Sequence, residues 1–265
     1  MAYSFKGSIS FGLVYIPIKL YLCVKSKDIG FNMLDKQTRS RVQYKKTCVD
    51  CGGRELQQGD IVKGYEYEDG KYVIFTDQDL EKLKTQKDKS ITIHNFVDLA
   101  TIDPIYFDKS YYVEPSSAEN AFALLLAAMK EQNKAGIAKT VLGSKEKLVA
   151  LRVRDNQMLL STLYFADEIQ RAPQISQDTP LKAEELKLAE TLIQNMHAEF
   201  APEQYKDEYR TRIAEAIQRK IEGKEIVVPK EEVRPEAAGL LDALQKSLES
   251  FIKTPPKKTS TRARA

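Results

Sequence analysis

The sequence contains no tryptophan, only two histidines and only three cysteines, Cys23, Cys48 and Cys51, among its 265 residues. An odd and small number of cysteines is not the pattern of a secreted protein stapled by disulfides. No apolar run approaches the roughly 20 residues that a transmembrane helix requires. The first residues also lack the charged start and apolar run of a secretory signal peptide. We therefore expect a soluble protein of the cytoplasm with no membrane partner.

The motifs of several enzyme classes are missing too. No glycine-rich loop leads into Lys-Ser or Lys-Thr at the start of a helix, as phosphate-binding loops do. His94 and His197 lie far apart in the sequence, and neither accompanies an obvious serine or cysteine nucleophile. The acidic residues near Glu66 gather at an expected hairpin tip, whereas a two-metal nuclease needs several acids at strand ends. We predict that the protein is not an enzyme, and a metal-dependent nuclease is kept as an alternative.

The net charge is only +3, so binding to a polyanion must depend on local clusters of charge. The segment 36–54 is such a cluster, because it holds six cations and a single acid, Asp50. Val42 and Tyr44 alternate with polar residues, which predicts a strand with one cationic face. A cationic face is suited to nucleic acid, and a solvated charged strand is the alternative. The six cations are Lys36, Arg39, Arg41, Lys45, Lys46 and Arg54.

Short apolar-alternating segments dominate the first two thirds of the chain and predict a mainly β fold, a barrel or a sandwich. Breaks are expected at Gly12 and Pro17, and Asp69-Gly70 predicts a hairpin turn. Capping boxes predict helices at Asp77–Lys84 and from Ser116 to about Asn133, with Gly136 ending the second. The expected strands are 8–11, 13–22, 60–68, 72–75, 90–99, 105–113, 138–142, 148–154 and 158–165.

The composition changes at Ala172-Pro173, where the apolar period becomes helical over 182–200 and 204–222. A linker at 229–235 then precedes an amphipathic helix, 236–252. A single helix cannot bury its leucine stripe alone, so this one is expected to dock in a partner's groove, or else on its own protein. The basic tail that follows adds nonspecific affinity for DNA or is simply solubilising. The stripe is Leu240, Leu241, Leu244, Leu248 and Phe251, and the cations of the tail are Lys257, Lys258, Arg262 and Arg264.

Cys48 and Cys51 flank Val49-Asp50 and precede two glycines, a pattern similar to a zinc knuckle. A structural zinc site needs four ligands, and the chain has no second Cys-x-x-Cys. Reduced free thiols in a tight turn are therefore expected, with no cofactor. A zinc ion held by Cys48 and Cys51, within one chain or shared by two subunits, is the alternative.

Six segments resemble the prokaryotic Ku family, in the family's order and over nearly the whole chain. The resemblance implies a homodimer in which two β-barrels and their bridging loops form a ring around the end of double-stranded DNA. It also implies a role in non-homologous end joining, recruitment of a multidomain ATP-dependent DNA ligase, and no catalytic activity. The segments are KGSISFGLVYIPIKLY at 6–21, RVQYKKTCVDCG at 41–52, VKGYEYEDGKYVIFTDQDLE at 62–81, FVDLATIDPIYFDKSYYVEP at 96–115, LVALRV at 148–153 and LLDALQKSLE at 240–249.

This resemblance predicts three regions. They are a Ku-type barrel over 1–175 with a bridge region at about 36–115, a helical arm over 176–228 and a partner-binding region over 229–265. A ring that accepts any DNA end should contact phosphates, which carry no sequence information directly. The expected DNA contacts are Arg39, Arg41, Lys45, Lys46, Arg54 and Lys63, with the four cations of the tail. The expected ligase contacts are Leu240, Leu241, Leu244 and Leu248. A general nucleic-acid binder with a zinc knuckle and no dependence on DNA ends is the chief alternative.

Overall fold

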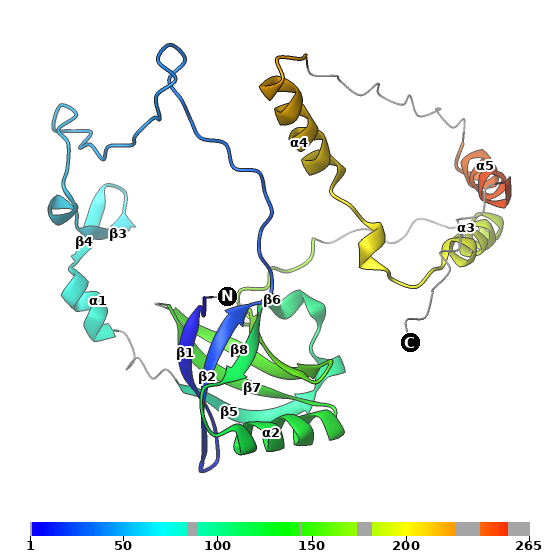
Figure 1. Cartoon of the computed structure of the whole chain (residues 1–265), viewed down its shortest axis with the longest axis horizontal. Helices are drawn as coiled ribbons and strands as arrows, with labels where there is room; N and C mark the ends of the chain where they lie inside the picture. The colour runs from blue at the N-terminus through cyan, green and yellow to red at the C-terminus, as the bar shows by residue number, and fades with distance from the viewer. Residues whose placement is uncertain (1, 84–89, 144, 174–181, 226–238, 254–265) are drawn as a thin grey trace. The chain divides into compact units, whose positions relative to one another are not determined.

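The computed structural model describes residues 2–83, 90–143, 145–173, 182–225 and 239–253 (Figure 1). The chain forms two compact units. One comprises residues 1–27 and 31–172, and the other comprises 28–30 and 173–265.

The first unit is built on a closed β-barrel, which confirms the predicted mainly β fold. Its strands are ordered β1-β2-β6-β9-β8-β7-β5, and the barrel closes through a parallel pairing of β5 with β1. The other pairings in the barrel are antiparallel. The strands are β1 Phe5–Phe11, β2 Val14–Leu22, β5 Ser90–Asp98, β6 Phe107–Pro115, β7 Lys134–Leu142, β8 Lys145–Arg154 and β9 Gln157–Leu163.

Aliphatic side chains fill the barrel, and Ile16, Ile18, Leu151 and Leu160 are wholly buried there. Helix α2, Glu119–Glu131, packs on the barrel and adds side chains to the same core. Figure 1 shows α2 in green along the lower edge of the barrel. Two short 3-10 helices, η2 Leu99–Thr101 and η3 Pro104–Tyr106, connect β5 to β6.

Three local predictions in this unit were wrong. Strand β2 continues through Pro17, which costs no hydrogen bond to β6 because their pairing begins only at Ile18. Gly136 lies inside β7, where a Cβ would stand 3.2 Å from the ring of Phe96. Helix α2 has no side-chain cap, because its N-cap residue is Ala118, whose methyl group accepts no hydrogen bond and whose backbone is left-handed with φ 58°. Residues 116–119 therefore form no capping box.

Between β2 and β5 the chain leaves the barrel, and the described residues 24–83 are called the excursion here. In Figure 1 it runs from dark blue to cyan. It contains the 3-10 helix η1 Gln58–Asp60, strands β3 Lys63–Glu68 and β4 Lys71–Phe75, and helix α1 Asp77–Leu83. Strands β3 and β4 form the predicted hairpin, and Thr76 and Asp79 form the predicted capping box of α1. The region predicted as a bridge, 36–115, also takes in β5 and β6, which are barrel strands.

The predicted cationic strand within 36–54 is wrong. The described chain has only two isolated bridges in this region, Leu34 with Arg41 and Thr47 with Glu55. Alternating side chains alone do not make a strand, because its backbone groups need a paired neighbour. Here each half of the segment folds back on itself as a small hairpin-like loop.

The second unit contains helices α3 Ala183–Met196, α4 Glu208–Ile221 and α5 Leu240–Lys253, with the 3-10 helix η4 Pro202–Gln204 between α3 and α4. Helix α5 lies against α3. The predicted linker, 229–235, lies outside the described residues. None of the described helices combines the length and the apolar character that a membrane crossing demands.

Candidate nucleic-acid interface

Arg39 and Arg41 belong to the first loop of the excursion, which Asp35 organises. The Asp35 carboxylate accepts hydrogen bonds from the Thr38 amide at 2.7 Å and the Thr38 hydroxyl at 2.8 Å. These hydrogen bonds lower the pKa of Asp35. Asp35 thus stabilises the turn, and neither arginine forms an ion pair within the described chain. Both arginines are exposed, so their charges are available to an external anion.

Lys45 and Lys46 belong to the second loop, which closes through a hydrogen bond of 2.8 Å from the Leu56 amide to the Lys46 carbonyl. Lys45 forms an ion pair with Glu55 at 2.8 Å. Lys46 donates to the amide oxygen of Gln58 at 3.2 Å, so its charge stays uncompensated by that contact. The two lysines therefore differ in how much of their charge the loop itself neutralises.

Lys63, at the start of β3, forms an ion pair with Asp77 at 3.2 Å. Its side chain and those of Asp77 and Lys45 are largely exposed, and that of Glu55 is about half-exposed. Exposed ion pairs contribute only about 0–1 kcal/mol. Both lysines could therefore exchange a carboxylate for a phosphate at little cost. All six predicted DNA contacts of the excursion are exposed: Arg39, Arg41, Lys45, Lys46, Arg54 and Lys63.

Cys48 and Cys51 face each other across the turn of the second loop, with their sulfur atoms 2.6 Å apart. Hydrogen bonding with Cys51, aided by backbone amides and by the charge of Arg54, lowers the pKa of Cys48. The same thiol contact raises the pKa of Cys51. Within the described residues no cluster of three or more cysteine, histidine or acidic side chains could hold a metal ion. The predicted zinc alternative thus has two ligands in place and lacks a third among these residues.

The excursion also exposes large apolar side chains. Tyr44 is 80% exposed and Val49 is 91% exposed. In the β3–β4 hairpin, Tyr65 and Tyr72 are more than half exposed, and so is Ile74. None of the described residues of the excursion is buried. A two-stranded hairpin without a covered face is marginally stable alone, so this one needs a further surface to pack on.

The predicted ligase-binding stripe is not isolated in the structure. Leu241, Leu244 and Leu248 of α5 are half-buried where α5 lies against α3. Leu188 and Leu192 of α3 are also half-buried. The sequence analysis kept docking of this helix on its own protein as an alternative but did not identify α3 as the partner, although the spacing of Leu188 and Leu192 by four residues was a signal for it. The predicted tail cations, Lys257, Lys258, Arg262 and Arg264, lie outside the described residues, and nothing is shown of the Leu240 side chain.

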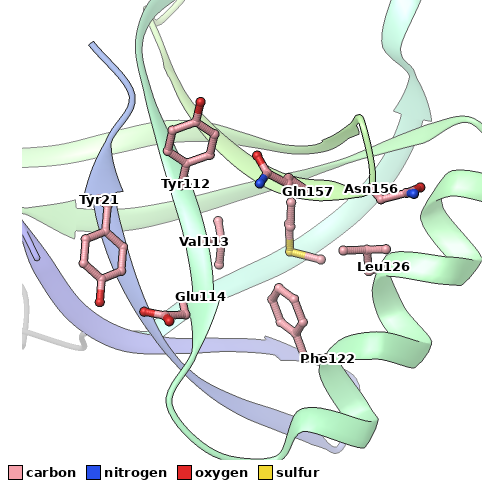
Figure 2. Close-up of a pocket in the computed structure, with 9 residues that line it drawn as sticks. Tyr21, Tyr112, Val113, Glu114, Phe122, Leu126, Asn156 and Gln157 are labelled. Atoms are coloured by element: carbon pink, nitrogen blue, oxygen red, sulfur yellow. The ribbon is translucent and has the colours of Figure 1, made fainter. Parts of the chain in front are cut away.

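An open pocket of about 540 Å³ lies on the barrel unit, between α2 and strands β6 and β9 (Figure 2). Phe122 and Leu126 of α2, which are partly buried against the core, form one wall. A hydrogen bond with the Glu114 carboxylate raises the pKa of Tyr21 at the opposite side. No histidine, cysteine or serine is among the described residues that line it, so it offers an apolar surface without an obvious nucleophile. The lining residues are Tyr21, Tyr112, Val113, Glu114, Phe122, Leu126, Asn156, Gln157 and Met158.

Comparison with known proteins places the chain in a family. Residues 10–188 match the Ku family model, described as the Ku70/Ku80 beta-barrel domain. The chain is 43% identical over 249 residues to a non-homologous end joining protein Ku of Lachnoclostridium phytofermentans, covering 94% of this chain and 96% of the relative. It is 40% identical to a protein of the same name from Bacillus subtilis, covering 92% of this chain and 80% of the relative. A third, from Archaeoglobus fulgidus, is 41% identical, with 94% and 99% covered. The matches include the barrel, its excursion and the helical unit, and the chain belongs to the Ku family.

Proposed function

We propose that this chain binds the ends of double-stranded DNA without regard to sequence and acts in non-homologous end joining. The relatives that it matches carry that process in their names. The observation that carries the proposal is the excursion, which leaves a closed barrel and exposes both its cations and its large apolar side chains. A binding role of this kind requires no catalytic residues, so we propose that the protein is not an enzyme. It would work in the cytoplasm, associated with the nucleoid.

The cations of the excursion are the groups that we propose contact DNA. Phosphate contacts position a protein on a duplex but carry no base information, as a protein that accepts any end requires. Arg39 and Arg41 have no ion-pair partner in the described chain, and Lys45 and Lys63 have exposed partners that a phosphate could replace. Each phosphate that is neutralised should steepen the dependence of log affinity on log salt by about 0.9.

We further propose that two copies of the chain form the ring that DNA enters. The exposed tyrosines of β3 and β4 support this, because tyrosine is enriched at protein interfaces and the hairpin has no covered face of its own. A second copy would supply the missing surface. Light scattering of the purified protein should then give about twice the chain mass of 30.1 kDa.

Helix α5 is the element that we propose recruits an ATP-dependent DNA ligase. Its leucines follow the spacing of a helix that binds in a groove. Because Leu244 and Leu248 are half-covered where α5 lies against α3, the ligase must compete with α3 for this stripe. We therefore propose that α5 leaves α3 when it binds the ligase.

Gel shift with linear duplex and with covalently closed circular DNA of the same sequence tests the DNA proposal. Binding confined to linear DNA is the expected result, because a closed circle offers no end to thread. Equal binding to both forms would support the general nucleic-acid binder instead. Cleavage that depends on a divalent metal would support the nuclease.

A further inference from the structure

The turn at Cys48–Arg54 brings two thiols together, and the proposed DNA binding uses neither of them. We propose that Cys48 and Cys51 are a redox-active dithiol, which peroxide converts to a disulfide within one chain. This inference is independent of DNA binding and stands or falls separately from the proposed function.

The backbone of the turn positions both thiols. The Gly53 amide donates to the Cys48 carbonyl at 3.1 Å, and the Arg54 amide donates to the Cys51 carbonyl at 3.3 Å. Gly52 and Gly53 have φ angles of 64° and 79°, a left-handed conformation that glycine adopts without strain. The chain therefore reverses within a few residues, and the two sulfur atoms lie 2.6 Å apart. The thiols are in contact before any bond forms, so little backbone movement is needed to join them.

Both thiols are open to a small oxidant. Cys51 is exposed and Cys48 is half-exposed. The third cysteine, Cys23, follows β2 and is anchored by a hydrogen bond of 3.0 Å from its amide to the Ser110 carbonyl. Cys23 belongs to the barrel side of the chain and shows no contact with the other two. It is therefore an internal control for the reaction.

The chemistry assigns the two cysteines different roles. The hydrogen bond with the Cys51 thiol, the backbone amides of Cys51 and Asp50 and the charge of Arg54 stabilise an anion at Cys48, so Cys48 is the nucleophile. Its thiolate attacks one oxygen of hydrogen peroxide, the O–O bond breaks, and a sulfenic acid and a water molecule form once a proton is taken up. The Cys51 thiolate then attacks the Cys48 sulfur, the S–O bond breaks, and the second oxygen leaves as water once it takes up a proton. Overall two thiols and one peroxide give one disulfide and two waters, with the sulfur atoms oxidised and the peroxide oxygens reduced.

The bond would stiffen the second loop. The Cys48 amide donates to the Arg54 carbonyl at 2.9 Å, and the Leu56 amide donates to the Lys46 carbonyl at 2.8 Å. Both hydrogen bonds close the loop that the disulfide would tie. Their amide protons should therefore exchange more slowly in the oxidised protein than in the reduced protein.

The test uses the full chain, reduced, freed of metal with a chelator and treated with stoichiometric hydrogen peroxide. The free thiols, three per chain in the sequence, should fall to one. Peptide mass spectrometry should show the loss of two hydrogen atoms from the peptide that holds Cys48 and Cys51, and a dithiol reductant should restore them. Cys51→Ser should stop at a sulfenic acid on Cys48 that a cyclic dione traps. Cys23→Ser should form the same disulfide as the unaltered protein.

Three results would overturn the proposal. The first is that both thiols stay unreacted while peroxide is consumed elsewhere. The second is a bond that involves Cys23 or joins two chains. The third comes from adding zinc alone to the reduced protein: tight binding that protects Cys48 and Cys51 from peroxide would assign the pair to a metal site.

Discussion

The barrel and the excursion differ in whether their apolar side chains are buried. In the barrel Ile18, Leu151 and Leu160 are wholly buried by the same chain. In the excursion Tyr44 and Val49 are mostly exposed, and none of its described residues is buried. The difference teaches that the residues of the barrel cover one another, whereas the excursion leaves its apolar side chains exposed, as its proposed binding to DNA and to a second copy requires.

The hydrogen-bonding pattern explains this difference. Every barrel strand has a neighbour on both sides, so the barrel has no free edge. The loops of the excursion are closed by a few local contacts, such as those of Asp35 with Thr38 and of Leu56 with Lys46. Regions of this kind open at a lower free energy than the global unfolding of the protein.

A matched pair of alanine substitutions, one in each region, should give the largest difference in the free energy of unfolding. Leu160→Ala should lower the free energy of unfolding by about 2–5 kcal/mol, because it removes buried methyl groups and leaves a cavity. Tyr44→Ala should change it by less than about 0.5 kcal/mol, because the ring lies in water. Urea unfolding of both variants measures the two values. A large loss of stability in Tyr44→Ala would mean that the excursion shares the core of the barrel.

Substitutions that remove charge should have the opposite result: those in the excursion should weaken DNA binding and leave the stability of the barrel unchanged. The triple variant Arg41→Ala, Lys45→Ala, Lys46→Ala should leave the barrel as stable as before but weaken binding to linear duplex roughly tenfold or more at moderate salt. The slope of log affinity against log salt should become shallower by about 0.9 for each phosphate contact that is lost.

The control for this variant removes three exposed cations of the barrel, Lys6, Lys109 and Lys145. It carries the same change in net charge but spares the excursion. Binding curves at several salt concentrations compare the two variants. Equal slopes would show that DNA contacts the barrel and the excursion alike, or neither.

The same contrast explains how far the sequence could be interpreted. The barrel strands follow from alternating apolar residues, because that pattern has meaning wherever one face of a strand is buried. Two residues that were expected to end an element lie inside strands because of contacts with distant parts of the chain. Pro17 stays inside β2 because β6 pairs only beyond it, and Gly136 lies in a strand because the ring of Phe96 fills its side-chain space. Neither neighbour can be identified from the local sequence.

The candidate interface was less predictable than the fold. Alternation of Arg41, Val42, Gln43 and Tyr44 predicted a strand, but with no buried face and only the isolated bridge of Arg41 with Leu34 it stays a loop. The cluster of cations in 36–54 was visible, but the partners Glu55 and Asp77 that compensate two of the predicted contacts, Lys45 and Lys63, were not. Such pairs depend on how the loops close, which the charge pattern does not determine.

The pair α3–α5 shares a property with each of the two regions. Like the barrel, it has an apolar stripe that is partly covered by the same chain; like the excursion, it is proposed to bind a partner. Leu192→Glu on α3 should loosen α5 and raise the affinity of the full chain for the ligase several-fold, since less of α5 is then occupied by α3. Gln194→Glu adds the same charge at an exposed position of α3 and should change nothing.

Leu244→Glu on α5 itself should abolish ligase binding and leave DNA binding intact. Fluorescence titration of labelled protein with the ligase measures all three variants. If Leu192→Glu weakens binding instead, the ligase recognises the α3–α5 pair as one surface. If Leu244→Glu still binds, α5 is not the docking element.

The last comparison uses two glycines with the same local geometry. Gly12, between β1 and β2, and Gly52, in the thiol turn, have φ angles of 57° and 64°, and a Cβ would contact nothing within 4 Å at either. Alanine should therefore meet the same backbone strain at both positions, about 1–2 kcal/mol. In Gly12→Ala that strain should lower the free energy of global unfolding, because the turn joins two paired barrel strands.

In Gly52→Ala the strain should appear only as faster amide exchange near Cys48, with the urea midpoint unchanged, because the loop opens without the barrel. Urea unfolding and hydrogen exchange of both variants distinguish the two responses. A shift of the urea midpoint by Gly52→Ala as large as that by Gly12→Ala would show that the excursion and the barrel unfold together. In that case the excursion would form one cooperative unit with the barrel, and the exposure of its side chains would no longer indicate a surface for a second molecule.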